Sequence, residues 1–69
     1  GADINSEDNN GFTALMGASQ VGQIEVVKVL IKEGADVNTQ NIDGVTALML
    51  ASVYGNREIV KLLIEAGAK

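Results

Sequence analysis

The chain repeats itself with a constant offset of 33 residues. The run GADIN at residues 1–5 returns as GADVN at 34–38, and GFTALM at 11–16 returns as GVTALM at 44–49. The offset holds without insertion, and about half of the overlapping positions are identical. Similarity at a fixed period of this length is typical of architectures in which one supersecondary unit stacks on the next. The chain is therefore expected to contain two copies of one unit.

The composition excludes most kinds of chemical site. The 69 residues include no Cys, His, Trp or Pro. No disulfide framework, thiolate or imidazole metal site, or Ser–His nucleophile pair can therefore be built. The formal charge of −4 and the scattered Lys and Arg argue against a phosphate backbone or an anionic membrane as a partner. We expect no enzyme, no cofactor, no metal, no nucleic-acid partner and no membrane partner.

The hydropathy of the chain gives no sign of a membrane span. No apolar run approaches the roughly 20 residues that cross a bilayer, and no basic and then apolar leader opens the sequence. A chain this short holds at most one compact unit. We expect a soluble, intracellular protein in the cytoplasm.

Each copy carries the signals of two short helices. Thr46 follows an Asp-Gly turn and can cap a helix over residues 47–54, which Gly55 ends. A second helix begins at residue 56 or 57 and runs to residue 65, before Gly67. Each helix has only about ten residues, so it must draw its stability from packing.

The second helix of each copy has one narrow polar stripe. The stripe consists of Glu25, Lys28 and Lys32 in the first copy and Glu58, Lys61 and Glu65 in the second. A helix that is apolar elsewhere needs cover on both flanks as well as beneath, which neighbouring copies supply. The Glu–Lys pairs three positions apart in each stripe are expected to form weak surface ion pairs.

The motifs GADVN, DG-x-TALM-x-AS and G-x-x-EIVKLLI-x-x-G together resemble the ankyrin repeat, which has the same period. The resemblance covers the whole chain. It implies an all-α solenoid of stacked antiparallel helix pairs with protruding turn or hairpin arms. The family usually has Thr-Pro-Leu-His where this chain has Thr-Ala-Leu-Met, at residues 13–16 and 46–49. The proline of the family motif favours the first helical position, and its histidine helps to link loops in the family. This chain has neither residue in the motif.

The resemblance also divides residues 1–69 into parts. Residues 1–7 match the tail of a preceding repeat, residues 8–40 a first repeat, and residues 41–69 a truncated second repeat. Neither end has the polar outer face of a capping repeat, and two repeats are fewer than the roughly three that stacked arrays need. We expect a piece of a longer array that is able to self-associate end to end through its apolar faces.

Two chemical sites are disfavoured by particular positions. Residues 3–14 begin like a calcium loop, but Asp8 stands where glycine is needed and Ala14 where the closing glutamate is needed. A solvated arm is the favoured interpretation. The carboxylates lie on polar stripes and turn tips, whereas general acid–base catalysis needs a desolvated pocket.

The resemblance implies a protein-binding role for the concave surface that the arm tips and the exposed face of the first helix form. Matching positions that differ between the copies are Asn9, Asn10, Phe12, Gln20, Val21, Ile42, Asp43, Val45, Val53 and Tyr54. All but the two asparagines form the candidate site, in which apolar and aromatic residues that give a large contact area are expected inside an acidic rim. Alternatively, Phe12 and Val45 pack between the arms, and Val53 and Tyr54 shield a helix end. The rival role is an architectural spacer or engineered scaffold segment without a partner.

Overall fold

A computed structural model describes residues 4–68, so residues 1–3 of the expected tail and residue 69 lie outside the described part. Within residues 4–68 the secondary structure consists of helices, with no strand. They are α1 (Ala14–Val21), α2 (Ile24–Lys32), α3 (Ala47–Val53) and α4 (Arg57–Glu65). The expected all-α fold is confirmed. Tyr54 caps α3 and is not its last residue.

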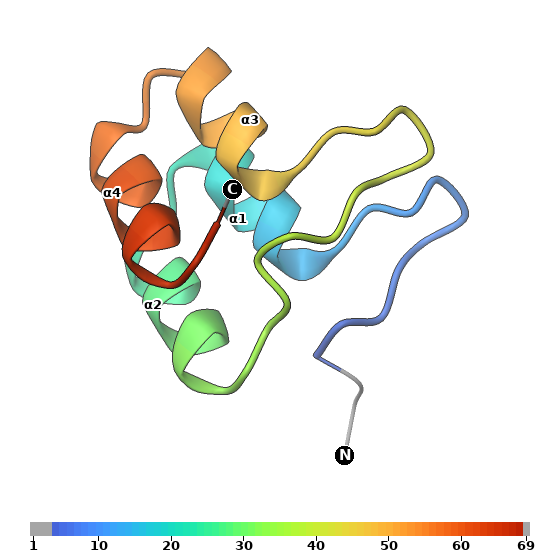
Figure 1. Cartoon of the computed structure of the whole chain (residues 1–69), viewed down its shortest axis with the longest axis horizontal. Helices are drawn as coiled ribbons and strands as arrows, with labels where there is room; N and C mark the ends of the chain where they lie inside the picture. The colour runs from blue at the N-terminus through green and yellow to red at the C-terminus, as the bar shows by residue number, and fades with distance from the viewer. Residues whose placement is uncertain (1–3, 69) are drawn as a thin grey trace.

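The helices form two hairpins, α1–α2 and α3–α4, which stack side by side (Figure 1). Helix α1 packs on α3 and helix α2 packs on α4, which gives an inner layer of α1 and α3 and an outer layer of α2 and α4. Residues 5–12, here called the first arm, precede α1, and residues 38–45, the second arm, precede α3. Both arms project to the same side of the molecule (Figure 1).

Threonine caps begin both inner helices as expected. Thr13 and Thr46 have extended backbones, and each Oγ1 accepts a hydrogen bond at 3.3 Å from the N–H three residues later. This bond satisfies one of the free N–H groups of the first turn. Both threonines are buried, so the caps also anchor the arms to the helices.

One core is shared by the two hairpins. The buried apolar residues are Leu15, Met16, Ala18, Val27, Val37, Ala47, Ala51, Ile59 and Leu63. Three of these are alanines of α1 and α3, whose small side chains let the two inner helices approach closely. Because the core lies between the hairpins, neither hairpin buries its apolar surface without the other.

The polar stripes of α2 and α4 face solvent, as expected. Lys28 Nζ lies 3.8 Å from Glu25 Oε1, which is the expected weak surface pair. The expected pair between Glu58 and Lys61 is wrong, because no salt bridge joins these two described residues. Solvated side chains gain little from such pairing and lose rotamer freedom on forming it.

Candidate interaction surface

Each arm is organised by one side chain. Asp8 Oδ1 accepts hydrogen bonds from the backbone N–H groups of Asn10 and Phe12, both at 2.9 Å. Asn41, at the equivalent position of the second arm, uses its Oδ1 in the same way, at 2.8 and 3.0 Å. Such side-chain bonds to nearby backbone stabilise a tight turn. The carboxylate and the amide therefore have the same structural role in the two arms.

The two arms lie against each other (Figure 1). The N–H of Ile42 donates to the carbonyl oxygen of Asn10 at 3.0 Å. Gly11 and Gly44 both have φ of 78°, the positive φ that is typical of tight turns at Asn-Gly and Asp-Gly dipeptides. A Cβ at Gly11 would lie only 3.0 Å from Asn41 Cα. The close approach of the second arm therefore requires glycine at position 11.

A second contact between the copies lies at the far ends of the inner helices. Gln20 Nε2 donates a hydrogen bond to Tyr54 Oη at 3.0 Å. Gln20 is in the last turn of α1, and Tyr54 is the C-cap of α3. Val21 and Val53 flank this bond in sequence, and both are exposed. The bond fixes the tyrosine ring at the boundary between the hairpins.

The eight candidate residues therefore fall into two groups at opposite ends of the inner helices. The arm group is Phe12, Ile42, Asp43 and Val45, and the helix-end group is Gln20, Val21, Val53 and Tyr54. Helix α1 has eight residues and is therefore about 12 Å long. The surface is a pair of patches, and a partner that uses both must span the inner layer.

Phe12 is the candidate residue with the most evident packing role. It is half-buried and packs against the core. Its ring lies over Gly17, where an added Cβ would be 3.6 Å from Phe12 Cε2. The equivalent residues of the second copy are Val45 and Leu50, also half-buried. The first copy thus pairs a large residue, Phe12, with Gly17, whereas the second copy pairs two residues of intermediate size, Val45 and Leu50.

Sequence reasoning missed Asn56, which joins the two hairpins. Its Nδ2 donates to the carbonyl oxygens of Ser19 at 2.7 Å and Gln20 at 3.3 Å. Its Oδ1 lies where a Cβ at Gly22 would approach within 3.1 Å. The sequence feature that could have indicated this contact is the position of Asn56 directly after Gly55, which ends α3. A side chain there can extend past the helix end toward the neighbouring copy.

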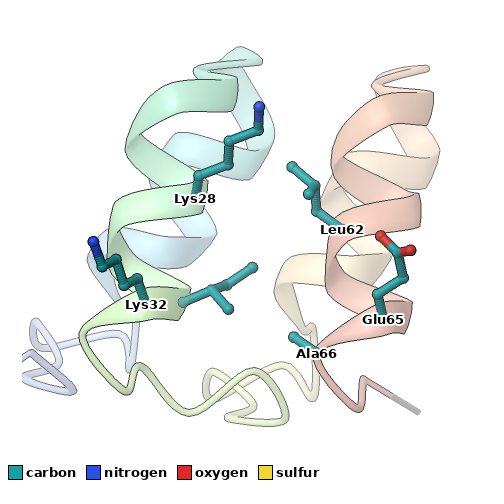
Figure 2. Close-up of a pocket in the computed structure, with 6 residues that line it drawn as sticks. Lys28, Lys32, Leu62, Glu65 and Ala66 are labelled. Atoms are coloured by element: carbon teal, nitrogen blue, oxygen red, sulfur yellow. The ribbon is translucent and has the colours of Figure 1, made fainter.

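A groove on the opposite, outer face was also missed. It is a cavity of about 290 Å3 between α2 and α4, lined by Lys28, Ile31, Lys32, Leu62, Glu65 and Ala66. Figure 2 shows the two lysines along α2, and Leu62 pointing from α4 into the space between the helices. Three residues of the solvent-facing stripes, Lys28, Lys32 and Glu65, therefore also line a shallow groove with an apolar floor.

Residues 4–68 contain neither a metal-binding cluster of acidic side chains nor a helix suited to a membrane. No cluster of three or more acidic side chains in residues 4–68 is placed to hold a metal ion, and Asp3 of the calcium-like run lies outside them. None of the described helices has the length and apolar character needed to cross a bilayer.

Helical hairpins stacked in register, each preceded by a projecting arm, define a repeat protein of the solenoid class. The family model described as "Ankyrin repeats (3 copies)" matches residues 1–69, and the chain belongs to the ankyrin repeat family. Repeats of this family are generally non-catalytic modules of protein–protein interaction. Comparison with curated proteins gives no match.

Proposed function

We propose that this chain binds a protein partner through the concave side formed by the arms and the inner helices. The observation that carries the proposal is the exposure of four large apolar side chains there. The exposed fractions are 72% for Val21, 70% for Ile42, 79% for Val53 and 55% for Tyr54. Groups of exposed apolar and aromatic residues are typical of interaction surfaces.

The charge of the surface selects the chemistry of the partner. Asp43 is exposed at the tip of the second arm beside Ile42, and the chain has a formal charge of −4. An acidic side chain beside an exposed apolar one favours a partner segment with apolar anchors flanked by Lys or Arg. Because the two patches are about 12 Å apart along α1, such a segment contacts both when it is extended.

The surface is held in place before any partner arrives. The arms are fixed by the side chains of Asp8 and Asn41, and Tyr54 is fixed by Gln20. A preformed surface reduces the ordering entropy that binding must overcome. This supports recognition over the architectural alternative, in which exposed apolar residues on the arms have no use.

The test is a selection of binding peptides from a displayed random library on the 69-residue chain. The selected peptides are then measured against the double variant Ile42→Ala with Tyr54→Ala. Removing two anchors is expected to weaken binding at least tenfold, since truncation of a central aromatic or apolar anchor costs more than about 1 kcal/mol. The selected sequences are expected to be rich in apolar and basic residues.

The control variant is Val29→Ala, which truncates an exposed apolar residue on the outer helix α2. It is expected to leave the affinities unchanged. Peptides that bind the double variant as well as the original chain would favour the alternative proposal, an architectural spacer or engineered scaffold segment with no partner of its own.

Two further expectations belong to this proposal. Ankyrin repeats are common in intracellular proteins, which supports a cytoplasmic setting. The repeat limits of 8–40 and 41–69 are supported by the equivalent positions of the arms and helices in the two copies. Imaging of the tagged protein in its own cells tests the first expectation, and the ability of residues 8–40 to replace 41–69 tests the second.

A further inference from the structure

The groove on the outer face has walls of opposite charge. Lys28 and Lys32 lie one turn apart on α2, and Glu65 lies on α4 (Figure 2). The apolar floor between the walls includes Ile31 and Leu62, which are both half-buried. The groove opens on the outer layer of α2 and α4 and not on the flanks along which hairpins stack. It is therefore a surface separate from both the helix–helix interface and the arms.

Basic side chains are unevenly distributed over residues 4–68. Every Lys and Arg of this described part lies on an outer helix, Lys28 and Lys32 on α2 and Arg57 and Lys61 on α4. The two arms contain acidic residues and no basic ones. Salt screens exposed charges beyond roughly 8 Å, so the nearby lysines act on a ligand more strongly than the formal charge of −4 of the whole chain. The α2 wall of the groove therefore attracts negative charge.

The charged groups of the groove have little use inside the molecule. Lys32 and Glu65 form no ion pair with another residue of the described part. Lys28 lies 3.8 Å from Glu25, whose side chain is 87% exposed. An exposed pair of this kind contributes little to stability, so a ligand carboxylate can replace Glu25 at small cost. Glu65 is in the last turn of α4, where a negative charge is unfavourable and a ligand cation beside it is favoured.

The spacing of the groove fits a helical ligand. Helices α2 and α4 have nine residues each, so each wall is about 14 Å long. Lys28 and Lys32 are four positions apart on one side, and Leu62 and Ala66 are four positions apart on the other. A ligand helix presents its own side chains at the same one-turn spacing, so contacts can recur at each turn. The cavity of about 290 Å3 is shallow and near the lower limit for small-molecule sites, which favours side chains of a larger ligand.

We propose that this groove binds a short amphipathic helix of a partner protein, with an acidic flank. Apolar side chains of the helix pack on Ile31 and Leu62. Carboxylates on one flank meet Lys28 and Lys32, and a basic residue on the other flank meets Glu65. The groove selects a charge opposite to that of the concave side, so the inference goes beyond the proposed function and does not depend on it.

Fluorescence anisotropy with two designed peptides tests the proposal. Both peptides have about three turns, are held helical by a cross-link on the outward face, and have leucines on the inward face and lysines on one flank. On the other flank the Glu peptide has glutamates and the Lys peptide has lysines. The original chain is expected to bind the Glu peptide about tenfold more tightly than the Lys peptide. This difference is expected to shrink as the salt concentration rises.

Reversing the basic wall is expected to reverse this preference. The groove variant, Lys28→Glu with Lys32→Glu, is expected to bind the Glu peptide about tenfold more weakly than the original chain does, because two attractions become repulsions. It is expected to bind the Lys peptide more tightly. The matched control is Arg57→Glu with Lys61→Glu, which makes the same change of charge at exposed positions outside the groove. The control is expected to keep the preference of the original chain.

Two further variants locate the peptide. Leu62→Ala truncates the floor and is expected to weaken binding of the Glu peptide about tenfold, with a helical circular dichroism spectrum as the check on folding. The double variant Ile42→Ala with Tyr54→Ala, which removes anchors of the concave side, is expected to bind the Glu peptide as the original chain does. The failure of one proposal is thereby distinguished from the failure of the other.

Three results would overturn the assignment of the groove. The first is an original chain that does not bind the Glu peptide. The second is an equal loss of binding in the groove variant and in its matched control, since the effect would then come from total charge alone. The third is loss of the Glu peptide in the concave double variant, which would place the peptide on the other side of the molecule.

Discussion

Identical residues in the two copies have different surroundings, and glycine shows this most directly. Gly11 and Gly44 have the same φ of 78°. A Cβ at Gly11 meets the backbone of Asn41 and Ile42, whereas a Cβ at Gly44 meets nothing within 4 Å. The pair therefore separates the cost of a left-handed conformation from the cost of a steric clash between the arms.

Replacing each glycine by alanine measures these two costs. Gly44→Ala is expected to lower the free energy of unfolding by about 1–2 kcal/mol, the strain of a left-handed alanine. Gly11→Ala is expected to cost about 1–3 kcal/mol more, because the backbone of the second arm must move. Urea denaturation followed by circular dichroism gives both values. Equal losses would show that the arms are not in close contact.

A second matched pair is serine in the inner helices. Ser19 is fully buried, and its Oγ has no hydrogen-bond partner in the described structure. Ser52, its equivalent, is exposed. An unsatisfied buried hydroxyl costs roughly 1–3 kcal/mol, so Ser19→Ala is expected to raise stability by about 1 kcal/mol. Ser52→Ala is expected to change stability by less than about 0.5 kcal/mol. A destabilised Ser19→Ala variant contradicts this assignment.

At the scale of single elements, the capping signals placed the helices well. Thr46, Gly55 and Gly67 were sufficient to predict both helices of the second copy to within a residue. These signals act over one or two turns of backbone, so the local sequence contains them. Burial could not be predicted in the same way. Ser19 and Ser52 each follow an alanine at equivalent positions of the inner helices, and the position of the hairpin in the stack decides which serine is covered.

The residues of the candidate surface could be predicted from the sequence, but their arrangement in two patches could not. The family resemblance indicated the eight residues, and their positions relative to the arms and helix ends follow from the repeat. Their separation into two patches results from the length of α1 and from the ring of Phe12, which packs over Gly17. Likewise, Asn56 reaches Ser19 only because the hairpins stack, a contact between residues far apart in sequence.

Helix α1 contains a correctable weakness. Gly17 is the one position of α1 without a side chain, and its φ is not in the left-handed region. Glycine inside a helix is about 1 kcal/mol less favourable than alanine. Gly17→Ala places a Cβ in ordinary contact with Phe12, 3.6 Å away, and is expected to raise the free energy of unfolding by about 1 kcal/mol. Thermal and urea unfolding measure this.

Gly17→Leu in the same position provides the contrast. Leucine copies Leu50 of the second copy, which lies beside the smaller Val45. Because Phe12 occupies the space, Gly17→Leu is expected to gain less than alanine, and the added change Phe12→Val is expected to recover stability. Additive effects of the two substitutions would show that residues 12 and 17 do not pack together.

For the whole molecule, the shared core predicts a single cooperative transition. Met16 and Val27 come from the first hairpin and Ile59 and Leu63 from the second, and all four are fully buried. Peptides of residues 1–36 and 34–69 each lack half of this core. Each is expected to give a largely unfolded circular dichroism spectrum alone, while the intact chain unfolds in one step.

The result that would contradict this expectation is a half-chain with the helicity of the intact molecule. Two separate transitions in urea would contradict it as well. Met16→Ala offers an independent check, since truncating a buried methionine is expected to cost about 2–5 kcal/mol. Met49→Ala, at the exposed equivalent position, is expected to cost far less.

Tyr54 gives the molecule its own optical reporter. The chain has one tyrosine and no tryptophan, so ultraviolet emission comes from a single phenol. That phenol accepts a hydrogen bond from Gln20 across the boundary between the two hairpins. A ligand on the inner helices or a separation of the hairpins therefore alters the same signal, and both events can be followed without attaching a dye.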